Sequence, residues 1–158
     1  MEQRINAFEK AQDAMKALLG LNKYLEKSTL DSSLLHLLEF RVSQLNGCAY
    51  CLDMHSKDLR AAGETEQRLY LLSAWRESPV YTSRERAALA WAEAVTFVAE
   101  DHVPDDVYEE ARKEFDEQEL IDLTFAVSLI NTWNRFNLAF RTKAGDYQVG
   151  QFASVATN

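Results

Sequence analysis

Residues 46–55, Asn-Gly-Cys-Ala-Tyr-Cys-Leu-Asp-Met-His (NGCAYCLDMH), hold both cysteines of the chain and one of its three histidines. One helical pattern stops near Asn46-Gly47, and a second begins at or just after Cys48. The second pattern ends before Gly63, because glycine is a frequent C-terminal stop of helices. On that second helix Cys48, Cys51 and His55 are three and four residues apart, so their side chains share one stripe at its start.

Outward from this stretch, apolar residues recur every three or four positions, and capping residues separate the runs. Thr82 with Glu85 and Asp116 with Glu119 are candidate capping boxes, each at the start of a helix. No alternating strand pattern and no linker is found. The sequence therefore predicts an all-α fold, a compact antiparallel bundle of six or seven helices. The predicted helices lie at about 4–27, 32–46, 48–62, 66–75, 82–98, from 104, and 116–141.

A length of 158 residues favours one domain, which we expect over residues 1–158 with a tail at 145–158 that forms a strap or is partly disordered. The formal net charge of -8 argues against a nucleic-acid or anionic-lipid partner. No apolar run approaches the roughly 18 residues of a transmembrane helix, and the charged N-terminus lacks a signal-peptide core. We therefore expect a cytoplasmic protein, in which thiols stay reduced and a close cysteine pair is more often catalytic, redox or metal-binding than structural.

The stripe of two thiols and one imidazole is suited to redox chemistry. The free N–H groups and the dipole at a helix start stabilise an anion, and a thiolate is such an anion. His55 can accept the thiol proton or hold the thiolate, and the second thiol can close a disulfide. Two alternatives remain: buried core cysteines, and a zinc site. Zinc needs four ligands, or three and a water, and only His36 and His102 remain as further histidines, so no metal or cofactor is expected.

Residues 41–78 (RVSQLNGCAYCLDMHSKDLRAAGETEQRLYLLSAWRES) resemble the core of the AhpD-like alkylhydroperoxidases of the carboxymuconolactone decarboxylase superfamily. The later segment DLTFAVSLINTWNRFNLAFR resembles the same subfamily, and the likeness covers about residues 30–142, the expected redox core. It implies an all-helical trimer or hexamer that reduces organic hydroperoxides with electrons from a lipoyl group or a thioredoxin-like protein. Cys51 then resembles the cysteine that attacks the peroxide, Cys48 the resolving cysteine and His55 the relay histidine.

One position departs from this family pattern, which usually has Glu twelve residues before the first cysteine. His36 stands there, and Glu39 is one helical turn further along. Three alternatives follow. His36 can keep a proton-relay role through its imidazole, Glu39 can reach the site from the next turn of the same helix, or the relay is weakened. The plainer alternatives are that His36 is an ordinary half-buried histidine and that Glu39 is a solvated surface charge.

A second polar and aromatic group consists of Glu93, Asn131, Trp133, Asn134 and Arg135 in two otherwise apolar helices. An acid and an arginine in such helices often pair, because an unpaired buried charge is costly. This group is interpreted first as structural and second as a wall of the active site.

Three other functions are compatible with the sequence. A disulfide exchanger or redox sensor would keep the dithiol but react with protein thiols. A lactone decarboxylase would need acid–base groups and no cysteine pair. A metal-binding oligomer would need no catalysis. Tyr50 lies between the cysteines, where its phenol can bond or simply pack, and His102 is assigned to a loop.

Overall fold

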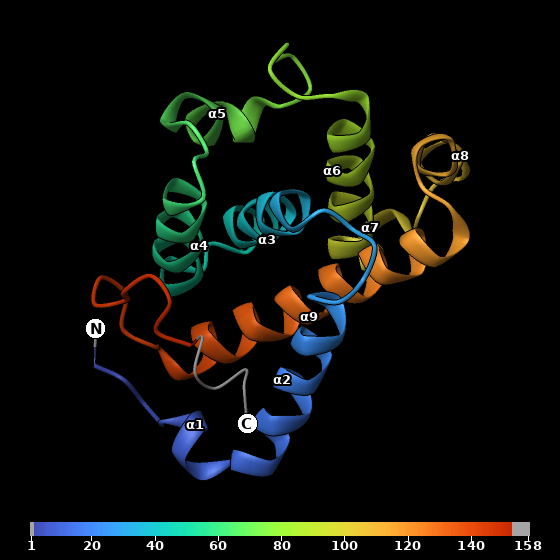
Figure 1. Cartoon of the computed structure of the whole chain (residues 1–158). Helices are drawn as coiled ribbons and strands as arrows, with labels where there is room; N and C mark the ends of the chain where they lie inside the picture. The colour runs from blue at the N-terminus through green and yellow to red at the C-terminus, as the bar shows by residue number, and fades with distance from the viewer. Residues whose placement is uncertain (1, 153–158) are drawn as a thin grey trace.

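The computed structural model describes residues 2–152, and over that range it contains helices and irregular connections but no strand (Figure 1). None of these helices is long and apolar enough to cross a membrane. The all-α prediction is thus confirmed. In chain order the elements are α1 (Ala7–Lys10), α2 (Gln12–Leu25), α3 (Ser32–Asn46), α4 (Ala49–Ala61), α5 (Glu66–Leu71), η1 (Leu72–Ala74, a 3-10 turn), α6 (Ser83–Thr96), α7 (Val98–Asp101), α8 (Asp105–Glu114) and α9 (Glu117–Phe140).

Helix α3 is the centre of the packing, with α4, α6 and α9 around it (Figure 1). Leu38 and Val42 belong to a large core shared with α6 and α9. Leu37 and Phe40, on a different side of α3, belong to a second core with α4, α5 and α6. A helix with apolar contacts on several sides is an interior helix, so a polar side chain on one of its buried sides needs a partner inside the protein.

The predicted helix boundaries are confirmed around the cysteine stretch and at both capping boxes. Gly47 has φ +67°, in the left-handed region where glycine is favoured, and it ends α3. Cys48 is the N-cap of α4. The boxes at Thr82 and Asp116 form with both of their hydrogen bonds.

The predicted helix at 4–27 differs from the structure, which divides it into α1 and α2 at Ala11. Asn6 caps α1 by accepting a hydrogen bond from the backbone N–H of Glu9. The backbone N–H of Arg4 donates to the carbonyl of Phe140 at 2.9 Å, which fixes the entering chain against the end of α9. This long-range bond and the cap at Asn6 account for the later helix start, whereas the break itself lies at Ala11, whose φ of -126° and ψ of 46° are not helical.

The described part of the predicted tail, residues 145–152, forms a strap along α4. Tyr147 is buried and its hydroxyl donates to Asp58 at 2.9 Å. Lys57 donates to the carbonyls of Gly145 and Tyr147, at 3.2 and 2.9 Å. Residues 153–158, the remainder of that prediction, lie outside the described residues.

Glu93 of α6 has different partners from the one that the sequence suggested. Arg41 of α3 pairs with it at 2.7 Å, the indole N–H of Trp75 donates to it at 2.9 Å, and Arg76 binds its other oxygen. Arg135 is exposed and bonds instead to Asn131 within α9. The suggested pairing of Glu93 with Arg135 is therefore wrong, because the arginine of α3 is nearer to the buried acid.

We expect Glu93→Gln to lower the free energy of unfolding by about 2–4 kcal/mol, because it leaves buried Arg41 without a counter-charge. Burial opposes ionisation of Glu93, but the three hydrogen bonds outweigh it and lower the pKa of this carboxyl. The stabilisation is thus complete above the unfolded pKa near 4.5 and is lost as the pH falls through the lower folded pKa.

Urea unfolding of the wild type and Glu93→Gln at neutral pH and at low pH measures this difference. Glu110→Gln, which removes an exposed pair with Lys113, is the control and should change the free energy of unfolding by less than ~0.5 kcal/mol. Equal losses in the two variants, or a Glu93→Gln effect that grows in acid, would contradict the prediction.

Candidate active site

Two helices and the turn between them bring the predicted catalytic residues together. Helix α3 supplies His36 and Glu39, and the start of α4 supplies Cys48, Cys51 and His55. All of these except Cys48 line a cleft of about 260 Å³. The α3–α4 turn thus places residues that are 19 positions apart in the sequence on one wall of one cavity.

The two cysteines are free thiols, and each is only 1% exposed. The backbone N–H of Cys51 donates to Cys48 Sγ at 3.4 Å, as expected of an N-cap side chain. A hydrogen bond from the Cys51 thiol lowers the pKa of Cys48, against the effect of burial. The same bond, together with burial, raises the pKa of Cys51. The hydrogen bond therefore favours ionisation of Cys48 over ionisation of Cys51, whose thiol faces the cleft.

Asparagines of α9 complete the surroundings of the thiols. Asn137 donates to Cys51 Sγ at 3.4 Å, and Asn134 donates to Ser43 of α3 at 3.1 Å. The amide of Asn46 donates to both Asn131 and Asn134, at 2.9 and 2.8 Å. These contacts anchor the turn before Cys48 to α9.

Sequence reasoning singled out Asn131 and Asn134 but missed Asn137. The available signal was the spacing of the three asparagines at 131, 134 and 137, which puts them on one face of a helix that is otherwise apolar. Trp133, from the same predicted group, lines the cleft, whereas Arg135 does not.

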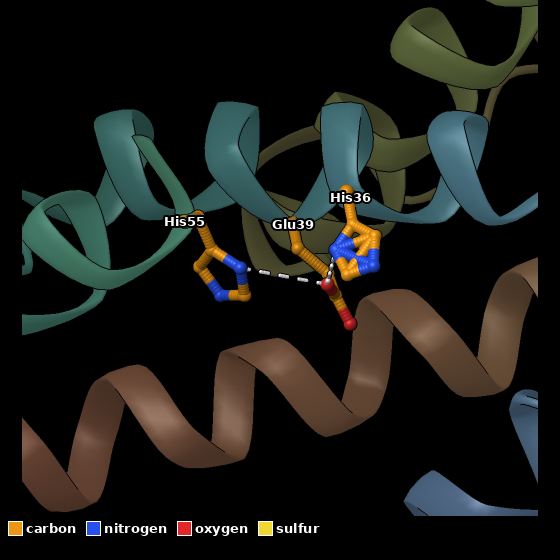
Figure 2. Close-up of side chains that lie close together, drawn as sticks. All are labelled: His36, Glu39 and His55. Atoms are coloured by element: carbon orange, nitrogen blue, oxygen red, sulfur yellow. Dashed lines mark ion pairs between the residues drawn. The ribbon is translucent and has the colours of Figure 1, made fainter. Parts of the chain in front are cut away.

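Glu39 lies between the two histidines (Figure 2). Its Oε2 is 3.6 Å from His55 Nδ1 and 3.9 Å from His36 Nδ1. Burial, with smaller contributions from the nearby charges of Asp58 and Glu26, raises the pKa of Glu39 to about 8. Burial, with a smaller contribution from His36, lowers the pKa of His55 to about 3. Near neutral pH the contact is thus between a protonated carboxyl and a neutral imidazole, not a charged pair.

The locations of His36 and Glu39 bear on the alternatives given above for residue 36, where the family pattern usually has Glu. The Glu39 side chain is 23% exposed and contacts His55, so the expectation of a solvated surface charge is wrong. The reason is that α3 is an interior helix with polar positions on its cleft side. The His36 side chain is 43% exposed, and its Nδ1 lies 3.9 Å from Glu39. Glu39 is therefore the group that directly adjoins His55.

The other walls of the cleft are mostly apolar and aromatic. Phe8 of α1 stacks on Trp133 of α9 with ring centroids 5.9 Å apart, and Phe152 of the strap stacks on Phe8 at 6.4 Å. Tyr50 also lines the cleft, whereas His102 lies in the exposed connection between α7 and α8. The remaining lining residues are Leu19, Asn22, Leu25, Glu26, Ser32, Leu35, Met54, Asp58, Ile130, Asn137 and Tyr147.

His36, Glu39 and His55 each offer one atom that could bind a metal ion, and these three atoms lie within 4.8 Å of one another. The cleft thus contains the buried thiol of Cys51, the protonated carboxyl of Glu39 and the neutral imidazole of His55. It also contains nitrogen and oxygen atoms that could bind a metal ion. Such a site can carry out thiol redox chemistry on a small molecule that enters beside Cys51.

Comparison with known proteins gives two curated relatives. The uncharacterized protein YdfG of Bacillus subtilis is 41% identical over 144 residues, which cover 91% of this chain and 98% of YdfG. The uncharacterized protein YnjA of Escherichia coli is 32% identical over 114 residues, covering 72% of this chain and 62% of YnjA.

Solved structures with the same fold include a protein of unknown function from Agrobacterium tumefaciens, provisionally described as the antioxidant defence protein AhpD. It is 44% identical, has a TM-score of 0.88, and the match covers 92% of this chain and 100% of that one. An uncharacterized peroxidase-related protein from Silicibacter sp. TM1040 has a TM-score of 0.79 at 23% identity, which shows the fold alone; the match covers 92% and 78% of the two chains.

The family resemblance seen in the sequence is confirmed by these relatives and by a family model. The model of the carboxymuconolactone decarboxylase family matches residues 9–94, a range that includes Glu39, both cysteines and His55. The chain therefore belongs to the carboxymuconolactone decarboxylase family.

Proposed function

We propose that the protein reduces organic hydroperoxides through a dithiol–disulfide cycle of Cys51 and Cys48. The observation that carries this proposal is the unequal placement of the two sulfurs. Cys51 faces the cleft beside His55, whereas Cys48 lies behind it within bonding reach of Cys51. A peroxide in the cleft therefore meets Cys51 first.

In the first step the Cys51 sulfur attacks the outer peroxide oxygen while its thiol proton passes to His55. The O–O bond breaks, Cys51 becomes a sulfenic acid, and His55 passes the proton on to the departing alkoxide, which leaves as the alcohol. Because burial lowers the pKa of His55 to about 3, no charged imidazole persists after the step. Asn137, which bonds to Cys51 Sγ, holds the sulfur in position. Glu39, next to His55, is suited to pass a proton to or from the imidazole.

In the second step the Cys48 thiolate attacks the oxidised Cys51 sulfur. The disulfide forms, and the hydroxyl leaves as water after taking a proton. The lowered pKa of Cys48 supports this assignment, because only the thiolate is an effective nucleophile. A dithiol donor then restores both thiols, so the balance is ROOH plus a dithiol giving ROH, water and a disulfide.

Burial of both thiols favours small reactants over a protein disulfide. Because each cysteine is only 1% exposed, a folded partner does not reach either sulfur, whereas a small dithiol or a lipoyl arm can enter the cleft. The apolar walls of Phe8, Trp133 and Met54 suit the organic part of a hydroperoxide.

Cys51→Ser should lower the consumption of cumene hydroperoxide, with dihydrolipoamide as donor, by about 10³-fold or more, because it removes the attacking sulfur. Cys48→Ser should also stop turnover, but only after one equivalent of peroxide has been consumed. Dimedone labelling followed by mass spectrometry of that variant should then find a sulfenic acid on Cys51. Wild-type rates in Cys51→Ser, or cysteine-independent turnover of a carboxylactone, would overturn the proposal.

Glu39→Gln should lower kcat/KM for the peroxide by about 10–100-fold, because the amide keeps the shape but cannot pass a proton to His55. His36→Gln should lower it by less than ~10-fold, since the His36 side chain is 43% exposed and solvent can replace its part in proton transfer. Both are measured in chelator-treated protein, with the exposed variant Glu110→Gln as control. A larger loss in His36→Gln than in Glu39→Gln would instead assign the proton path to the rim histidine.

A further inference from the structure

The same cleft contains a second cluster that the thiol chemistry does not account for in full. We propose that His36, Glu39 and His55 form a binding site for a first-row divalent transition-metal ion of the zinc type. The three side chains come from facing positions on α3 and α4 and converge on one point beside the cleft (Figure 2). The site shares no ligand with the cysteine pair.

The distances within the cluster fit a small metal ion. A tetrahedral zinc ion with bonds of about 2.0–2.1 Å places its ligand atoms about 3.4 Å apart. Oε2 of Glu39 is 3.6 Å from His55 Nδ1 and 3.9 Å from His36 Nδ1, and all three ligand atoms lie within 4.8 Å. The two distances from Glu39 would have to shorten by a few tenths of an ångström, and the distance between the histidine atoms by up to about 1.4 Å, for the set to close on one ion.

The donor types match those of known metal centres. Two imidazoles and one carboxylate form the protein ligand set of many catalytic zinc sites and of non-haem iron centres. Three protein ligands leave a further position, which here opens into the cleft of about 260 Å³. A bound ion would therefore be accessible to a small molecule rather than closed off as in a structural site.

Unpartnered nitrogens provide a second, independent observation. The His55 side chain is 7% exposed, and neither of its ring nitrogens has a hydrogen-bond partner among the described residues. Nδ1 of His36 is likewise buried without one. Leaving a buried polar atom unpaired costs about 1–3 kcal/mol, and a metal ion at this point would satisfy both Nδ1 atoms.

The charge of the cleft favours a cation. Glu26 and Asp58 line the cleft together with Glu39, and no lysine or arginine is among its described lining residues. Carboxylates in a partly enclosed cavity raise the local concentration of cations. A count of histidines along the sequence does not indicate this cluster, because only the α3–α4 turn brings Glu39 between His36 and His55.

Because His55 is also the proton acceptor in the peroxidase cycle, a bound ion and peroxide reduction would compete. That consequence rests on the proposed function, whereas the binding itself does not. The test therefore measures binding directly, in a Cys48→Ser/Cys51→Ser protein from which thiol ligands have been removed. The oxidised wild-type protein, with its disulfide closed, serves as a second background.

Zn²⁺ titration against a chromophoric chelator should give one ion per chain. His55→Gln and Glu39→Gln should each weaken the affinity at least ~10-fold, and Co²⁺ should give a visible absorption that these variants lose. His102→Gln removes a histidine outside the cleft and should leave the affinity unchanged. A large excess of Mg²⁺ should not displace Zn²⁺, because Mg²⁺ prefers oxygen ligands.

Absence of binding in both backgrounds, or binding that none of the three cleft substitutions weakens, would overturn the proposal. Circular dichroism identifies any variant that fails to fold. His36→Gln changes a half-exposed side chain and is the variant with least risk to folding, so its affinity decides the question if His55→Gln unfolds. Loss of peroxide turnover with intact Zn²⁺ binding would remove the proposed function and leave this site.

Discussion

The amide of Asn46, bonded to two asparagines of α9, is the contact on which the site depends. It stands at the end of α3, where Gly47 turns the chain into α4. Asn134 is fully buried and Asn131 nearly so, and an unpaired buried amide costs about 1–3 kcal/mol. The hydrogen bonds from Asn46 to Asn131 and Asn134 fix where the α3–α4 hairpin packs along α9. The same position places the Cys51 sulfur against Asn137.

Burial then sets the chemical character of each group in the cleft. Glu39 keeps its proton and His55 remains neutral because neither is well solvated. The hydrogen bonds at the start of α4 lower the pKa of Cys48, the sulfur that does not line the cleft. Cys48, Cys51 and His55 follow one another along the start of α4, and Glu39 adjoins His55 from α3. Metal binding and proton transfer would draw on the same imidazole.

The sequence predicted local features well and long-range contacts poorly. Helix ends at Gly47, Thr82 and Asp116 were predictable because caps act within a few residues. The shared stripe of the cysteines and His55 followed from helical spacing alone. The position of Glu39 beside His55 did not, because it depends on how α3 packs against α4. The partner of Glu93 was misassigned for the same reason, since helical spacing does not indicate that Arg41 of a different helix is nearer than Arg135.

The stack of Phe8, Trp133 and Phe152 joins segments near the two ends of the described chain over one cavity. A ribosome makes Phe8 early and Phe152 long afterwards. The wall of the cleft is therefore incomplete until nearly all of the described chain has been synthesised.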